Sequence, residues 1–429
     1  MPGRRALLVA LCAVALLSAG GLVAGGTFSA FSSSTSNSAN TFSAAASFGG
    51  GTCPSTRPAV NWLTGMEHGM DTTAGGGMWQ GGSGNAIEDT AVARNGSYSL
   101  KTAPAGAALY RSRLSLSFPY AKQMTWRFAI RLATLPSANV GELFAAYSST
   151  SGGPAMRLGY DASTQKFTLG LRSSSTTYAT PVQAGSTVAA GTWYVVDLRY
   201  DVSADPHTAD WRIDGVAQPQ ASIAAPAGDI QQWLMGTTLT TDTYTANFDD
   251  IAQAENATSY PFGDGKVLAL RPDGMGTSVG ASNFHNDDLS PINSTSWMRL
   301  ADLPMTASTD YVEQGTLSTT SYLEMTVEDT AETCIRNVGA FVVYDQLAQN
   351  ATNHGKTVVT VDGVERVVND ADMAGTTYRL APRYAVLQPV QPTWSQASVN
   401  GLRWRIGYSS DVSPPPNWHS LLIEYEVPQ

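Results

Sequence analysis

Three carboxylates close together, Glu328, Asp329 and Glu332, are the residues best suited to acid–base chemistry in this sequence. Two carboxyl groups on one face of a strand can serve as nucleophile and general acid in glycoside cleavage. These three lack the alternation that such a face requires, so we interpret the cluster as a solvated turn. No other catalytic motif stands out, and the sequence predicts that the protein is not an enzyme.

The amino-acid composition limits the classes of molecule that we expect the protein to bind. The chain has 429 residues, a net charge of -10 and only 14% charged residues. An acidic surface repels phosphates, so we do not expect nucleic acid as a partner. Hydrophobic residues make up 43%, which is enough for real cores. Three cysteines and five histidines exclude a Cys/His zinc cluster as the organising principle.

The N-terminal residues have the pattern of a secretory signal peptide. Arg4 and Arg5 precede the uncharged apolar run 6–19 and a Gly/Ala-rich stretch. A membrane anchor is the alternative, because the uncharged run is long enough to span a bilayer if glycines are counted. The first interpretation predicts a signal peptide at 1–29 and a secreted, cell-surface-associated protein that has no membrane segment after cleavage.

A more specific pattern follows the apolar run. The block Gly25–Ser32 (GGTFSAFS) precedes Thr41–Ala44 (TFSA). Together they resemble the signal peptides of biofilm-fibre subunits and camelysin-type proteins of Gram-positive bacteria. The resemblance implies cleavage near Ser29–Ala30.

The rest of the chain is predicted to be all-β. Residues 30–61 are rich in Ser, Thr, Ala and Gly and read as a flexible leader. Alternating apolar residues and turn clusters follow at short spacing, as in sandwiches. Asp214-Gly215 and Asp362-Gly363 are type I′ hairpin signals. A polar, Pro/Gly-containing stretch divides the pattern, which predicts two β-sandwich (jelly-roll) domains at 62–257 and 263–429.

Several blocks in the first domain share one superfamily resemblance. They are Gly65–Gly69, Asn95–Lys101, Gly191–Leu198, Trp211–Gly215 and Phe248–Ile251. In this order they resemble a concanavalin A-like (laminin-G-like) jelly roll, with some likeness to carbohydrate-binding modules. The resemblance implies a fold but no particular ligand.

The same resemblance implies a structural calcium ion. In that superfamily the first and last strands pair and place the opening glutamate beside the closing aspartates. Glu67, Asp249 and Asp250 would then bind Ca²⁺ together with carbonyl oxygens near 95–97. Ordinary surface carboxylates are the alternative.

Sugar binding is the activity that the first domain is predicted to have. The superfamily's β-glucan-cleaving enzymes carry a Glu-x-Asp-x-x-Glu strand, and no such run exists here. Aromatic rings can stack on pyranose faces. Trp79 lies in a glycine-rich loop and is the best candidate, with Tyr147, Tyr178 and Tyr244 beside Ser/Thr-rich loops. Trp79 folded back onto the sandwich as a lid is the alternative.

The second domain loosely resembles β-sandwich domains of phage virion and tail-associated proteins. The segments Gly265–Asp273, Trp297–Leu300 and Val338–Leu347 carry this resemblance, which implies a structural or attachment role. Cys53 and Cys334 remain after cleavage. They are compatible with one disulfide, although both could stay free or Cys53 could pair between chains.

These observations predict an exported surface protein that binds a polysaccharide or another cell-surface polymer through its first domain. The alternative is a structural subunit of an extracellular fibre or a virion-like appendage. In that case the leader segment Ala30–Phe48 would add as a strand to a neighbouring copy and cause self-association.

Overall fold

The structure is a computed structural model of the whole chain. It describes residues 60–68, 79, 81–83, 86–102, 108–112, 121–148, 154–173, 178–224, 229–255, 259–301, 310–316, 318–346, 354–372, 381–408 and 416–429. The chain from Thr52 to Gln429 forms one compact unit. The predicted signal peptide and nearly all of the predicted leader lie outside the described residues. No helix among the described residues is long and apolar enough to cross a membrane.

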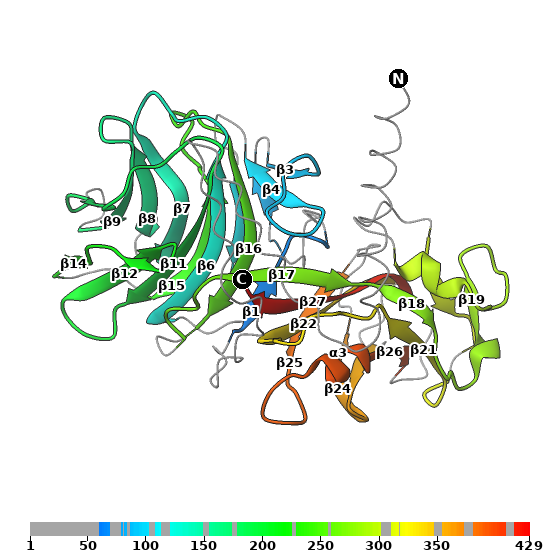
Figure 1. The fold of residues 1–429 in the computed structure, drawn as a ribbon. Helices are drawn as coiled ribbons and strands as arrows, with labels where there is room; N and C mark the ends of the chain where they lie inside the picture. Colours follow the sequence, from blue (N-terminus) through cyan, green and yellow to red (C-terminus); the bar gives the residue numbers. More distant parts are fainter. Residues whose placement is uncertain are drawn as a thin grey trace, which may run out of the picture. The chain divides into compact units, whose positions relative to one another are not determined.

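The predicted all-β fold is confirmed (Figure 1). The first sandwich has a nine-stranded sheet with the order β13-β12-β11-β6-β16-β4-β3, to which β1 and β14 add at β16 and β12. Its strands are β1 (Trp62–Thr64), β3 (Ile87–Asp89), β4 (Ser99–Thr102), β6 (Gln123–Leu132), β11 (Trp193–Asp201), β12 (His207–Ile213), β13 (Val216–Ala217), β14 (Ala221–Ile223) and β16 (Ala246–Ala254).

The second sheet of this sandwich has seven strands in the order β10-β9-β8-β7-β15-β5-β2. They are β2 (Gly81–Ser83), β5 (Ala108–Ser112), β7 (Val140–Ser148), β8 (Pro154–Asp161), β9 (Lys166–Leu171), β10 (Val182–Gln183) and β15 (Ile230–Gly236). All of its described pairings are antiparallel, so side chains alternate between the core and the outer face.

The second sandwich is built from the strands that follow. A six-stranded sheet, β19-β20-β27-β22-β25 with β17 on β27, accompanies a five-stranded sheet, β18-β21-β26-β23-β24. The strands are β17 (Gly265–Leu270), β18 (Pro272–Met275), β19 (Phe284–Asn286), β20 (Val312–Gln314), β21 (Tyr322–Val327), β22 (Asn337–Gln346), β23 (His354–Val361), β24 (Val364–Asp372), β25 (Ala381–Leu387), β26 (Arg403–Tyr408) and β27 (Pro416–Pro428). Helical turns are limited, among the described residues, to η1 (Ala281–Asn283), η2 (Ser296–Leu300) and α3 (Gln396–Asn400).

Both predicted hairpin turns are confirmed. Asp214 and Gly215 have φ of 49° and 76°, and Asp362 and Gly363 have φ of 46° and 80°. Positive φ at both central residues is the type I′ geometry, whose twist matches that of the flanking strands. These turns join β12 to β13 and β23 to β24.

Strand β6 shows how the two sandwiches share one buried region. Its alternate residues Met124, Trp126 and Phe128 enter the first core. Arg127 points away from that core and is nevertheless fully buried, because β27 of the second sandwich covers that face and brings Glu426 to it. The core cluster of the first sandwich also includes Phe341 of β22.

Candidate functional site

A groove on the outer face of the seven-stranded sheet is the best candidate for a binding site. On β8 the residues Met156 and Leu158 face the core, while Arg157 and Gly159 line the groove. The groove has a volume of about 470 Å³. Pockets for small ligands usually measure about 300–1,000 Å³, so this one can hold one or two sugar rings.

Three in-strand glycines form part of the groove lining, one each on β7, β8 and β9: Gly141, Gly159 and Gly170. A Cβ atom on Gly159 would lie 2.6 Å from the carbonyl oxygen of Val140, so this glycine is required by close backbone approach. A Cβ atom on Gly170 would make only ordinary contacts, the nearest at 3.7 Å to Pro181. Glycine inside a strand often marks the approach of a ligand or another backbone, and this is the sequence signal that could have located the groove.

A guanidinium stacked on a tyrosine ring stands at this groove. The Cζ atom of Arg157 lies 3.6 Å from the centroid of the Tyr178 ring. The Tyr178 hydroxyl donates to the carbonyl oxygen of Pro154 at 3.0 Å, which fixes the ring. Both residues are half-buried. Stacking orients the guanidinium while leaving its edge available for hydrogen bonds.

Two buried carboxyl groups, Asp242 and Glu142, support the groove from the adjoining loop and strand. Asp242 Oδ2 accepts from the backbone N–H of Gly141 and of Glu142 and from Thr237 Oγ1, at 2.9–3.1 Å. Glu142 Oε2 accepts from the backbone N–H and the hydroxyl of Thr238, both at 3.1 Å. Burial raises the pKa of Glu142, and these hydrogen bonds oppose that shift. The two carboxyl groups thus hold the loop after β15 against β7.

The aromatic set predicted from the sequence is not brought together. Trp79 is fully buried and packs edge-on against Trp62 and Trp233, with centroids 5.2 and 5.7 Å away. The predicted stacking role of Trp79 is therefore wrong, because the fully buried side chain leaves no ring face for a sugar. Tyr244 is also buried, and its hydroxyl donates to the carbonyl oxygen of Glu142 at 2.8 Å.

Tyr147 and Tyr178 are the two predicted aromatics that stay partly exposed. Tyr147 packs with Ala145 and Leu234 on the outer face of the same sheet as the groove. Its hydroxyl lies 3.2 Å from Thr238 Oγ1. A sugar-binding role for these two tyrosines stays a prediction, whereas Arg157 and the glycines were missed by the sequence analysis.

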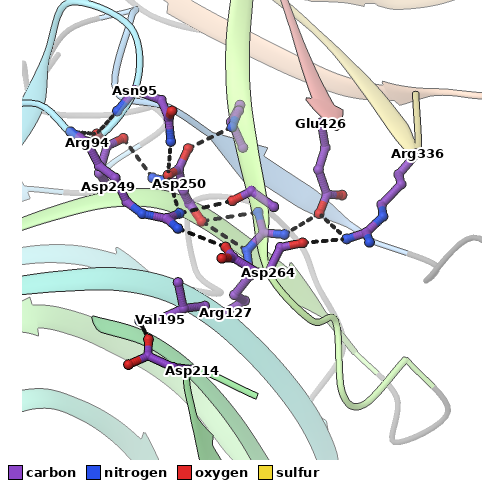
Figure 2. A network of polar contacts seen from close by, with 12 residues as sticks. Arg94, Asn95, Arg127, Val195, Asp214, Asp249, Asp250, Asp264, Arg336 and Glu426 are labelled. Atoms are coloured by element: carbon purple, nitrogen blue, oxygen red, sulfur yellow. Dashed lines mark hydrogen bonds and ion pairs between the residues drawn. The ribbon is translucent and has the colours of Figure 1, made fainter. Parts of the chain in front are cut away.

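The carboxylates predicted to bind calcium lie in a different place, in a polar network beside β16 (Figure 2). Asp249 Oδ2 accepts from the backbone N–H of Arg94 at 2.8 Å and of Asn95 at 3.3 Å. Asp250 Oδ2 accepts from Arg94 Nη1 at 2.8 Å and from Asn95 Nδ2 at 2.7 Å, while its Oδ1 accepts from Val267 N. Burial raises the pKa of both aspartates.

The third predicted ligand, Glu67, is likewise held by protein donors. Its Oε1 accepts from the backbone N–H of Ser97 at 2.7 Å and of Tyr98 at 3.0 Å. In the described part of the chain, no group of three His, Cys, Asp or Glu side chains is placed to hold a metal ion. We therefore correct the predicted ligand set of Glu67, Asp249 and Asp250: N–H donors occupy the positions that a cation would need.

Calcium binding by the protein stays a prediction, now without assigned ligands. A cation that binds only the folded state at a hundredfold excess over its Kd would raise the free energy of unfolding by about 2.7 kcal/mol. Thermal melts of the protein in calcium and in chelator measure this directly. Superimposable curves would contradict the prediction.

The same network continues into the second sandwich. Arg127 donates from Nε and Nη2 to the carbonyl oxygen of Asp250, both at 3.2 Å, and pairs with Glu426 through Nη1. Arg94 bonds Asp264 at 2.8 Å, and Arg336 donates to the Asp264 carbonyl oxygen at 2.9 Å. Figure 2 shows these side chains converging from both sandwiches. We interpret this network as a structural connection between the two sandwiches and call it the joint. Its central ion pair, Arg127–Glu426, is fully buried.

A second carboxyl group of β27, that of Glu424, should make the stability of the protein depend on pH. Glu424 Oε1 accepts from Thr64 Oγ1 at 2.8 Å and from Gly65 N at 3.0 Å. Burial raises the pKa of Glu424 to about 8, with a further contribution from the charge of Glu67. Because the folded state holds this proton more tightly, the contribution to stability is complete below about pH 4.5 and decreases as the pH rises to about 8.

We expect the free energy of unfolding to fall across that window with a slope of up to about 1.4 kcal/mol per pH unit from this group. Urea unfolding at several pH values should show a flatter profile for Glu424→Gln. Glu365→Gln, at a more exposed carboxylate, is the control and should follow the wild type. Parallel profiles for wild type and Glu424→Gln would contradict the assignment.

Of the two predicted disulfide residues, Cys334 is disulfide-bonded. Cys53 lies outside the described residues, so the pairing of Cys53 with Cys334 stays a prediction.

No protein-family model matches this chain, and no curated protein matches it either. Solved structures with partial similarity include a Trypanosoma rangeli sialidase complex, with 15% identity and a TM-score of 0.34 over 44% of this chain and 30% of that one. A pentraxin from Limulus polyphemus has 12% identity and a TM-score of 0.29 over 37% and 76% of the two chains. The receptor binding domain of botulinum neurotoxin type G has 9% identity and a TM-score of 0.30 over 77% and 87%.

These similarities correct one prediction. The sequence was interpreted as that of a protein that is not an enzyme, yet the similar structures include several sialidases. The exclusion of catalysis is withdrawn on this finding. The chain spans less than a third of the sialidase chains, and at these TM-scores the likeness assigns no activity to it.

Proposed function

We propose that this is an exported protein that binds a glycan in the groove of its seven-stranded sheet. The observation that carries the proposal is the groove itself, about 470 Å³ in volume and lined by both polar and apolar groups. Asn139 and Gln183 offer amides, and Pro181 and Leu239 offer apolar surface. A sugar ring presents hydroxyls at its edge and C–H groups on its face, so it matches such a lining.

Two sequence resemblances support this proposal. The blocks that resemble a concanavalin A-like, laminin-G-like jelly roll fall in the sandwich that carries the groove. The signal-peptide pattern supports export to the cell surface, where polysaccharides are available. N-terminal sequencing of the protein from culture medium tests export, and an intact Met1 would contradict it.

Filling the groove tests the binding site. Gly170→Leu adds a side chain where a Cβ atom makes only ordinary contacts, so the fold should tolerate it. A glycan array should identify a ligand, with a Kd of about 10 μM to 1 mM because the site is open. Calorimetry should then show at least about tenfold weaker binding by Gly170→Leu, which corresponds to about 1.4 kcal/mol.

Val216→Leu is the matched control, since it enlarges an exposed residue on the other sheet. It should bind the glycan like the wild type. Normal binding by Gly170→Leu would show that the groove is not the site. A blank array would contradict the glycan proposal itself.

A further inference from the structure

Arg157 is held in place without a close ion pair to a described carboxylate, although its charge acts on the buried Glu142 and opposes the rise that burial causes in the pKa of that group. Its guanidinium stacks on Tyr178 at 3.6 Å, and the hydrogen bond of that tyrosine to Pro154 fixes the stack. Arg157 makes no hydrogen bond or ion pair with any residue that the structure describes. A half-buried guanidinium normally finds an acceptor, because its five N–H donors lose water on burial.

The donors of Arg157 lie over the glycine lining of the groove. Its Nη1 is 3.7 Å from the position that a Cβ atom of Gly141 would take, and its Nε is 3.9 Å from that of Gly170. Apart from the Tyr178 ring, the guanidinium therefore borders the glycine lining of the groove. It is the only Lys or Arg side chain among the described residues that line the groove.

The acidic groups of the groove are already engaged by other donors. Asp161 accepts from Ser163 N at 2.8 Å, from Ser163 Oγ at 2.7 Å and from Gln183 Nε2 at 2.7 Å. Asp242 accepts from two backbone N–H groups and a threonine hydroxyl. Neither lies within ion-pair distance of Arg157, so the positive charge remains available to a ligand.

We propose that the groove selects glycans that carry a carboxylate, such as a uronic acid, and that Arg157 binds this carboxylate. The inference rests on the proposed function and specifies its ligand class. A guanidinium presents two parallel N–H donors that match the two oxygens of a carboxylate, and such charge-assisted pairs are about twice as strong as neutral hydrogen bonds. The Tyr178 stack orients the fork before the ligand arrives, which reduces the entropy lost on binding.

The test compares an oligogalacturonate with the same oligosaccharide after reduction of its carboxyl groups to alcohols. We expect calorimetry to show that the wild type binds the acidic form at least about tenfold more tightly. Arg157→Gln keeps a polar but shorter, uncharged side chain and should bind both forms equally. Arg157→Lys should retain part of the preference, because it keeps the charge but loses the fork.

Arg199→Gln is the matched control. Arg199 lies over the Tyr260 ring at 5.2 Å but pairs with Asp210 on the other sheet, so its loss should leave the preference unchanged. Melting curves confirm that each variant is folded.

Three outcomes separate the claims. Equal binding of both oligosaccharides by the wild type, or an unchanged preference in Arg157→Gln, overturns the role of Arg157 and leaves the glycan proposal standing. Acidic-oligosaccharide binding that survives in Gly170→Leu places the ligand elsewhere and overturns the groove. No binding of either form overturns this inference, and a blank glycan array in addition would overturn the proposed function.

Discussion

Arg127→Met should destabilise the protein by about 3–5 kcal/mol, the cost of leaving one member of a buried ion pair without its partner. Arg127 and Glu426 are both fully buried, and they join β6 of the first sandwich to β27 of the second. Asn337 Nδ2 still donates to Glu426 at 2.6 Å and Arg336 Nη1 lies 3.8 Å from Glu426 Oε1, but neither the neutral amide nor this longer ion pair replaces the close contact with Arg127. Urea unfolding followed by tryptophan fluorescence measures the loss.

The double variant Arg127→Met/Glu426→Leu is the informative control. Removing both charges removes the uncompensated group, so the double variant should recover much of the lost stability. A double variant as unstable as the sum of the two single variants would show that the pair is not coupled. An Arg127→Met protein with wild-type stability would contradict the buried joint altogether.

Trp79→Ala should cost about 3–5 kcal/mol, as expected for removing a large buried aromatic side chain. Trp79 is fully buried between Trp62 and Trp233, and the three rings meet edge to face. Loss of the ring leaves a cavity that its two rigid neighbours cannot fill. The free energy of unfolding, measured in denaturant, is again the readout.

The conservative variant Trp79→Phe should lose less, because it keeps an aromatic ring in the cluster. Glycan binding by folded Trp79→Phe should equal that of the wild type, since the residue does not reach the groove. A melting temperature unchanged in Trp79→Ala would contradict the buried position that the structure assigns.

The fold was largely predictable because its signals are local. Alternation in β6 and the dipeptides Asp214-Gly215 and Asp362-Gly363 each report on a few neighbouring residues, and the structure forms these elements there. No local sequence pattern predicts the hydrogen bond from Thr64 to Glu424, because this bond depends on how the two sandwiches pack against each other.

The site was harder to predict for the same reason. Glycines around Trp79 suggested an exposed loop, but composition does not show that the Trp79 ring packs against Trp62 and Trp233. The groove is lined by residues from several strands and loops, and the in-strand glycines Gly141, Gly159 and Gly170 are its only sequence signal. Nothing in the sequence around Arg157 shows that it lines this groove and stacks on Tyr178, because both depend on tertiary structure.

The hydrogen bond between Thr64 and Glu424 also limits how early the fold can be completed during protein synthesis. The two residues are 360 positions apart. Translation at 5–20 residues per second takes about 20–70 s to produce Glu424 after Thr64. During this interval β27 is not yet there to cover the face of β6 that carries Arg127, so we expect its guanidinium to stay hydrated. Closure of the joint is therefore a late step, in which Arg127 loses its water only when β27 brings Glu426 to pair with it.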